Sequence, residues 1–110
     1  MIITFADNNL RKYANDNRLA VRKLGPKRAE LFHRRLEDIY DTENFAGLEH
    51  LSGRYHQLKE NKKGQWACDL DHPYRLIFEP AVKPAPIDKD GKIILNEIEA
   101  AEIIKIEDYH

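Results

Sequence analysis

The chain has 110 residues, of which 42% are hydrophobic and 34% charged, and its formal net charge is -1. A chain of this size fits one domain over residues 1–110, which should bury about two-thirds of its unfolded surface. No apolar run approaches the roughly 20 residues that a membrane span needs. Cys68 is the only cysteine, so no internal disulfide can form and a reducing cytoplasm is the expected location.

Charge is distributed unevenly along the chain. Residues 1–40 carry nine Lys and Arg against five Asp and Glu, whereas residues 79–110 carry four against eight. The first third is therefore basic and the last third is acidic. Because the total is close to zero, composition alone does not indicate a nucleic-acid-binding protein.

The N-terminal residues predict a strand followed by a short helix. Residues 2–5, Ile-Ile-Thr-Phe, are β-branched and aromatic, as is typical of a strand. Asp7 or Asn8 can then cap a helix. Its apolar face has the spacing i, i+3 and i+4 and comprises Leu10, Tyr13 and Ala14. The polar segment 15–18 interrupts that helix.

A second, longer helix is expected from Gly25-Pro26, because proline is well tolerated at the first helical position. The residues expected to face the core recur with a helical period and are Ala29, Phe32, Leu36 and Ile39. Lys27 and Arg34 share the opposite face. That face is either a solvated surface with pairs such as Arg34–Asp38 or a surface that contacts phosphate or a partner.

An antiparallel meander is expected after a linking loop over residues 41–53. Its strands and turns are Tyr55–Lys59, the turn Glu60–Gly64, Gln65–Leu70, the turn Asp71–Pro73, and Tyr74–Glu79. Trp66, Cys68 and Leu70 recur at period two, which predicts a half-buried strand. In the third strand, Arg75 and Ile77 are expected on one face, and the opposite face carries Tyr74, Leu76 and Phe78.

A long excursion is expected between the third and last strands of this sheet. Three prolines and an Asp-Lys-Asp-Gly segment lie between Pro80 and Ala100, which is longer than an ordinary hairpin connection. Residues 93–100 fit either the end of a strand or a short helix. The β-branched segment Glu102–Ile106 predicts the last strand.

Four segments in this order resemble the HigB branch of the RelE-like toxins. They are Tyr55–Lys59, a basic turn ending in Gly64-Gln65-Trp66, Tyr74–Phe78, and the terminal Glu107–His110. The resemblance spans nearly the whole chain. It implies an α+β, RelE-like fold, in which a small antiparallel or mixed sheet packs against two N-terminal helices.

The resemblance also implies a function. HigB-type toxins are ribosome-dependent endoribonucleases that cut messenger RNA without a metal or other cofactor. Each is neutralised by a cognate antitoxin, here expected to be a HigA-like helix-turn-helix protein. The implied partners are thus the antitoxin, the ribosome and messenger RNA, with no membrane.

Metal-free RNA cleavage needs a base, an acid and cations around the phosphate. By resemblance, His56 and His110 are the acid and base, in an order that the sequence leaves open, while Lys59 and Arg75 bind phosphate. Tyr109 is expected to stack on or orient a base. Further RNA-binding candidates are Arg54, Lys62 and Lys63.

Each candidate also has a structural explanation. His56 can be a hydrogen-bonded residue of the sheet, the lysines can form a solvated turn, and Arg75 can pair with an acidic neighbour across the sheet. His56 and Lys59 converge only if their strand ends or bulges between them. The alternative function is a non-catalytic RelE-fold protein that binds a helix-turn-helix partner or RNA.

Two other features of the meander are expected to have a structural and not a catalytic role. Asp69, Asp71 and His72 invite a metal-site interpretation, but Asp and Pro are typical of a hairpin turn and no second ligand cluster accompanies them. Cys68 shares its strand parity with apolar neighbours, so we expect the thiol to point inward and not to act as a nucleophile.

Overall fold

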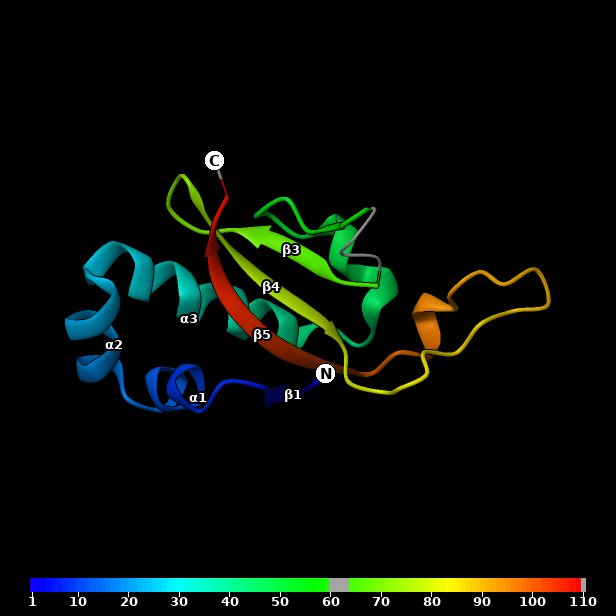
Figure 1. The fold of residues 1–110 in the computed structure, drawn as a ribbon, viewed down its shortest axis with the longest axis horizontal. Helices are drawn as coiled ribbons and strands as arrows, with labels where there is room; N and C mark the ends of the chain where they lie inside the picture. Colours follow the sequence, from blue (N-terminus) through cyan, green and yellow to red (C-terminus); the bar gives the residue numbers. More distant parts are fainter. Residues whose placement is uncertain (60–63, 110) are drawn as a thin grey trace.

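The computed structural model describes residues 1–59 and 64–109. Over this part of the chain, a five-stranded sheet runs in the order β1-β5-β4-β3-β2 beside a layer of helices (Figure 1). The strands are β1 (Ile2–Phe5), β2 (His56–Gln57), β3 (Trp66–Asp69), β4 (Tyr74–Pro80) and β5 (Ala100–Asp108). β1 pairs with β5 in parallel and the other pairs are antiparallel. The expected α+β fold with a mixed sheet is confirmed.

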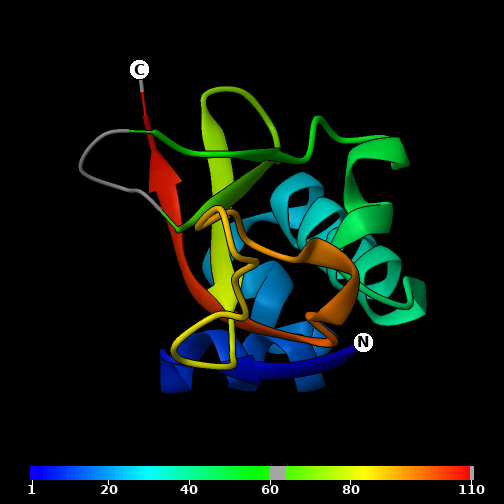
Figure 2. The ribbon, with the colours of Figure 1, turned by 90° about the vertical axis from the view of Figure 1, so that its right-hand side faces the viewer.

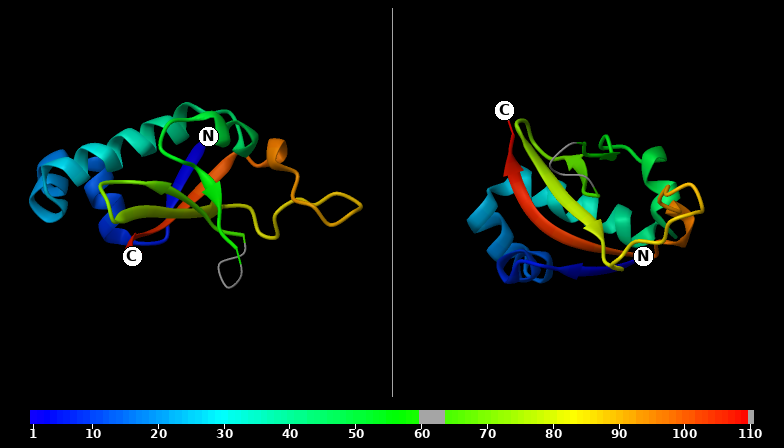
Figure 3. Two further views of the ribbon diagram at one scale, coloured as in Figure 1. Left: turned by 90° about the horizontal axis from the view of Figure 1, so that it is seen from above. Right: turned by 45° about the vertical axis from the view of Figure 1, so that its right-hand side comes forward.

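The helical layer lies on one side of the sheet, as Figure 3 shows from above. Its elements are the α-helices α1 (Asn8–Asn15), α2 (Asn17–Leu24) and α3 (Pro26–Asp41), followed by the 3-10 helix η1 (Phe45–His50). The loop expected over residues 41–53 therefore contains one short helix. None of the helices in the described residues is long and apolar enough to cross a membrane.

α2 corrects the expectation of two N-terminal helices. Asp7 caps α1 by accepting hydrogen bonds from the backbone N–H groups of Asn9 (2.7 Å) and Leu10 (3.2 Å). Asp16 ends α1 in an extended conformation, and its carboxylate also accepts from the backbone of Leu19 at 3.1 Å, which caps α2. The polar segment thus ends one helix and begins the next.

α3 begins at Pro26 and presents the expected apolar residues to the core. Those residues are all buried and are Ala29, Phe32, Leu36 and Ile39. Lys27 and Arg34 are exposed. The expected Arg34–Asp38 pair is wrong, because Arg34 instead pairs with Glu30 one turn earlier, at 2.9 Å.

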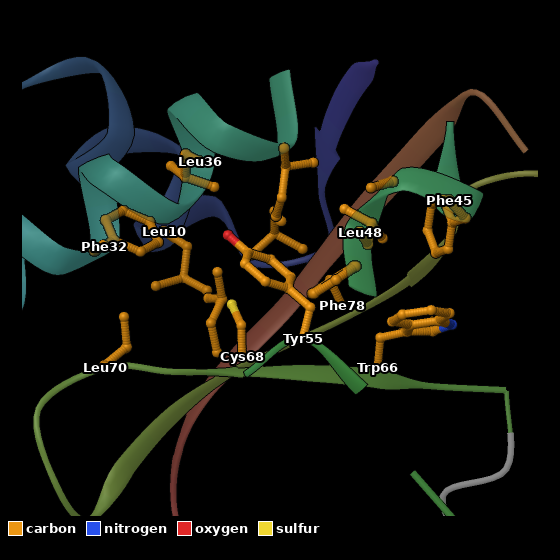
Figure 4. Packing of buried hydrophobic residues seen from close by; sticks show 14 of the residues in the cluster. Leu10, Phe32, Leu36, Phe45, Leu48, Tyr55, Trp66, Cys68, Leu70 and Phe78 are labelled. Carbon is orange, nitrogen blue, oxygen red and sulfur yellow. The ribbon is translucent and has the colours of Figure 1, made fainter. Parts of the chain in front are cut away.

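Aromatic side chains fill the centre of the core between the helices and the sheet (Figure 4). Phe45 of η1 makes edge-to-face contacts with Trp66 (5.5 Å between ring centroids) and Phe78 (5.9 Å). Tyr55 packs on Phe78 at 6.2 Å, and its hydroxyl donates to the carbonyl of Arg35. Such pairs contribute about 0.5–1.5 kcal/mol beyond their buried area, so η1 is fixed on β3 and β4.

A bulge in β5 changes which side chains face the helices. Ile77 pairs with Lys105, but the next residue, Phe78, pairs with Ile103, so Ile104 is an extra residue in β5. An extra residue inverts the alternation of the strand beyond it. Lys105 therefore lies on the sheet face that is turned away from the helices.

The segment between β4 and β5 extends beyond the end of the sheet (Figure 1), so that it lies toward the viewer in Figure 2. Ile87 and Ile93 form an antiparallel bridge within it. The 3-10 helix η3 (Leu95–Glu97) precedes the start of β5 at Ala100. The short-helix alternative for residues 93–100 therefore holds, and the expected long excursion is confirmed.

Phe45→Ala should lower the free energy of unfolding by about 3–5 kcal/mol, because it leaves a cavity against two buried rings. The matched control is Val82→Ala, since Val82 is 49% exposed and its truncation should change stability by no more than about 0.5 kcal/mol. Urea unfolding followed by Trp66 fluorescence measures both. Equal effects of the two substitutions would contradict this packing.

Candidate functional site

The sheet face opposite the helices carries two cross-strand rows. Register places the first row in the order His56, Ala67, Ile77 and Lys105, and the second in the order Asp69, Arg75 and Glu107. Directly opposed side chains on one face lie within contact distance. Titratable and charged groups from β2, β3, β4 and β5 are thus gathered on one small surface.

Arg75 is at the centre of this surface and is only 9% exposed. Its Nε and Nη2 atoms donate to Glu107 Oε2 at 2.8 and 2.7 Å, respectively. Lys105 Nζ lies 3.3 Å from the other oxygen of the same carboxylate. The expectation that Arg75 pairs with an acidic neighbour across the sheet is confirmed, and one carboxylate is shared by two cations.

Tyr109 connects the end of β5 to this cluster. Its ring lies under the guanidinium of Arg75, with Cζ 3.9 Å from the ring centroid, and its backbone N–H donates to the carbonyl of Pro73 at 3.3 Å. Tyr109 as a whole remains 46% exposed. The chain therefore returns to Arg75 at its C-terminal end, with an aromatic face still open to solvent.

Arg54 binds Asp69 and Tyr109 together. Its Nε and Nη2 atoms donate to the two oxygens of Asp69 at 3.0 and 3.2 Å, and Nη2 also donates to the Tyr109 hydroxyl at 3.3 Å. The hydrogen bond to Asp69, then that to Tyr109, raises the pKa of Arg54 above its ordinary value. Arg54 is therefore a permanent cation beside Tyr109.

His56 is held by one hydrogen bond to the backbone. Its Nδ1 lies 2.7 Å from the carbonyl oxygen of Arg54. Because a carbonyl oxygen can only accept, Nδ1 carries the hydrogen, and in the neutral ring Nε2 carries a lone pair. His56 can thus accept a proton at Nε2.

β2 is shorter than the expected strand Tyr55–Lys59, since it contains only His56 and Gln57. The strand ends between His56 and Lys59, which is the condition under which these two side chains can converge. Lys59 is exposed beyond that end. Three other expected site residues, Lys62, Lys63 and His110, lie outside the described residues.

Three charged residues of the site were missed by sequence reasoning. Lys105 and Glu107 lie beyond the bulge, so an unbroken alternation through β5 would have put them on the wrong side. Asp69 was assigned only to a turn or a metal cluster. The charged residues after Ile104 alternate with Ile106, but this pattern places Lys105 and Glu107 on the site face only once the bulge is known.

The carboxylates of the turn region bind arginines. Asp69 is paired with Arg54, and Asp71 accepts two 3.0 Å hydrogen bonds from Arg28, whose guanidinium also lies 3.5 Å from the ring centroid of Tyr74. Within residues 1–59 and 64–109, no three His, Cys, Asp or Glu side chains are grouped as metal ligands.

Solved structures of bacterial toxins have a similar fold. The chain resembles a YoeB/ParE toxin from Agrobacterium tumefaciens with 14% identity and a TM-score of 0.61, over 100% of both chains. It also resembles the toxin-antitoxin YoeB-YefM complex from Staphylococcus aureus, in two structures each with 18% identity and a TM-score of 0.58, over 100% of this chain and 97% of the other. The fold is therefore that of the YoeB/RelE-like toxins.

Sequence comparison adds no narrower classification. No family model matches the chain, and no curated protein matches it. The solved structures support the RelE-like fold that the sequence suggested, whereas the HigB branch itself is not confirmed.

Cys68 should not react with thiol reagents in the folded protein. It is fully buried on the core face, as expected, and burial raises the pKa of its thiol to about 12. Raising the pH from 7 to 10 should therefore leave native labelling by a disulfide reagent slow, while the urea-unfolded chain becomes more reactive as its thiol ionises near pH 8.5. Rapid native labelling with an ordinary thiol pH profile would contradict the burial.

Proposed function

We propose that this protein is the toxin of a type II toxin-antitoxin system and a ribosome-dependent messenger-RNA endonuclease of the HigB kind. The observation that carries the proposal is that His56 and Arg75 share one face of the sheet by register, with the Tyr109 ring packed on Arg75. These side chains supply a proton acceptor, a phosphate-binding cation and an aromatic surface.

In the proposed reaction, the 2′-hydroxyl of one nucleotide attacks the adjacent phosphorus. A new 2′-oxygen–phosphorus bond forms, the bond from phosphorus to the 5′-oxygen breaks, and the products are a 2′,3′-cyclic phosphate and a 5′-hydroxyl. The 2′-hydroxyl proton passes to a base, and an acid protonates the leaving 5′-oxygen. The Nε2 lone pair of His56 fits the base, which leaves the acid to His110.

Arg75 is suited to the charge that develops on the phosphate. Its guanidinium is largely buried, and an oriented donor is worth more where water is excluded. The phosphate must share or replace the carboxylate of Glu107, which now accepts from Arg75 Nε and Nη2. Lys59, with Lys62 and Lys63, would bind the flanking phosphates, and the exposed Tyr109 ring would stack on a base.

The proposed partners are an antitoxin and the ribosome. The Staphylococcus aureus relatives by fold were solved as YoeB-YefM complexes, which supports an antitoxin for this chain. The HigA-like helix-turn-helix identity of that antitoxin rests on the resemblance of the sequence to HigB toxins. Cleavage in the decoding site requires RNA to reach the face that carries Arg75.

One observation favours the second candidate function, a non-catalytic RelE-fold protein that binds a helix-turn-helix partner or RNA. Both arginines of the site already have carboxylate partners, since Glu107 binds Arg75 and Asp69 binds Arg54. Such pairs are also what a purely structural surface would contain. Cleavage assays separate the two functions.

His56→Ala should reduce cleavage of ribosome-bound messenger RNA by about 10²–10⁴-fold, as expected for loss of a general acid or base. Lys59→Ala should reduce it about 10–100-fold, because a charge-assisted hydrogen bond to phosphate contributes about 1.5–3 kcal/mol. The measurement is 5′-end mapping after brief induction of each variant, with Lys89→Ala in the exposed excursion as the matched control.

The wild-type chain should arrest translation, and cuts should be phased with the reading frame. Absence of arrest, or toxicity of His56→Ala equal to that of the wild type, would leave only the binding function. Cuts without reading-frame phase would contradict action in the decoding site.

A further inference from the structure

We infer that Arg54 is a positioning residue that orients His56 through its backbone and Tyr109 through its side chain, and not a phosphate anchor. The inference rests on the proposed function for its catalytic meaning, although the two contacts themselves belong to the free protein. It revises the RNA-binding role that the sequence suggested for Arg54.

The backbone of Arg54 has an unusual conformation. Arg54 has a φ of 56°, in the left-handed region that non-glycine residues rarely adopt. This turn aims the Arg54 carbonyl oxygen at Nδ1 of His56, 2.7 Å away. The carbonyl selects the Nδ1–H tautomer, so it leaves Nε2 of the neutral ring as the acceptor.

The side chain of Arg54 holds the aromatic ring of Tyr109 in place. Arg54 Nη2 donates to the Tyr109 hydroxyl, while Asp69 holds the guanidinium by two hydrogen bonds. The same Tyr109 ring lies 3.9 Å from Arg75 Cζ. A half-exposed tyrosine near the end of the chain is thereby held at both its hydroxyl and its face.

The turn that carries Arg54 is itself supported from α3. A Cβ added at Gly53, whose φ is 116°, would lie 2.7 Å from Cζ and Nε of Arg35. Arg35 donates to the carbonyl oxygens of Asp69 (2.8 Å) and Ser52 (3.4 Å), and Asp69 N–H donates to the Gly53 carbonyl at 2.8 Å. These contacts stabilise the left-handed conformation of Arg54, which is unfavourable for a residue with a side chain.

The existing hydrogen bonds argue against phosphate binding by Arg54. A guanidinium binds phosphate best through two parallel N–H donors. In Arg54, the Nε–Nη2 edge that would provide this fork is occupied by Asp69, and Nη2 also donates to Tyr109. A phosphate there would have to break the contact that positions Tyr109.

The two roles predict opposite effects for Asp69→Asn. If Arg54 were a phosphate anchor, removing the carboxylate charge would free its guanidinium and strengthen RNA binding. If Arg54 is a positioning residue, Asp69→Asn should lower kcat by about tenfold with KM changed less than about threefold, because small misplacements of a site are costly.

Two substitutions of Arg54 separate its backbone from its side chain. Arg54→Gly keeps the carbonyl and suits a positive φ, so it should fold, retain the Nδ1–H tautomer of His56 and release Tyr109. Arg54→Lys keeps the charge and loses the two-point hold on Asp69. The matched control is Arg34→Lys, since the Arg34 side chain is also 58% exposed and paired with a carboxylate, but lies on α3.

The decisive measurement uses the free 110-residue chain and NMR. In the wild type, ¹⁵N shifts of neutral His56 should report the Nδ1–H tautomer, and the Arg75 side-chain protons should show the ring-current shift of Tyr109. Arg54→Gly and Arg54→Lys should lose the ring-current shift, whereas Arg34→Lys should keep it. A wild-type His56 in the Nε2–H form, or an unchanged Tyr109 contact in both Arg54 variants, would overturn the inference.

Cleavage by the same variants gives the catalytic half of the test. Arg54→Lys should lower kcat by about tenfold and leave KM nearly constant; a rise in KM alone would overturn the positioning role in favour of phosphate binding. If the wild-type protein cleaves nothing, the proposed function fails, yet the NMR result still decides whether Arg54 positions His56 and Tyr109.

Discussion

The pairing of β4 with a bulged β5 is the constraint on which the rest of this site depends. One extra residue, Ile104, keeps Ile103 opposite Phe78 in the core and still turns Lys105 away from the helices. Without that extra residue, a charged side chain would enter the core or an isoleucine would enter the charged surface. The same pairing brings the end of the chain back to Arg75, so the core and the site share one structural cause.

Ion pairs also hold the charged side chains of the site in fixed orientations. Glu107 accepts from Arg75 and Lys105, while Asp69 accepts from Arg54. The exposed Arg54–Asp69 pair adds little to stability. The Arg75–Glu107 pair is largely buried, so loss of one partner would leave an uncompensated charge. In both pairs the carboxylate holds a planar guanidinium in one orientation.

The strands and the apolar face of α3 could be predicted because they depend on local periodicity. The alternation of Trp66, Cys68 and Leu70 and the helical spacing around Phe32 specify burial directly. α2 was missed because Asp16 was interpreted as an interruption, although one aspartate can end a helix and cap another. The bulge, and with it the roles of Lys105 and Glu107, depends on pairing with a distant strand and leaves no local signal.

The acidic partners inside the site also bear on the proposed binding of RNA. When Lys or Arg neutralises a phosphate, cations condensed on the nucleic acid are released, which makes affinity fall steeply with salt. Glu107 and Asp69 already neutralise Arg75 and Arg54 in the free protein. The charge that this cluster offers to a phosphate is therefore smaller than its number of cations suggests.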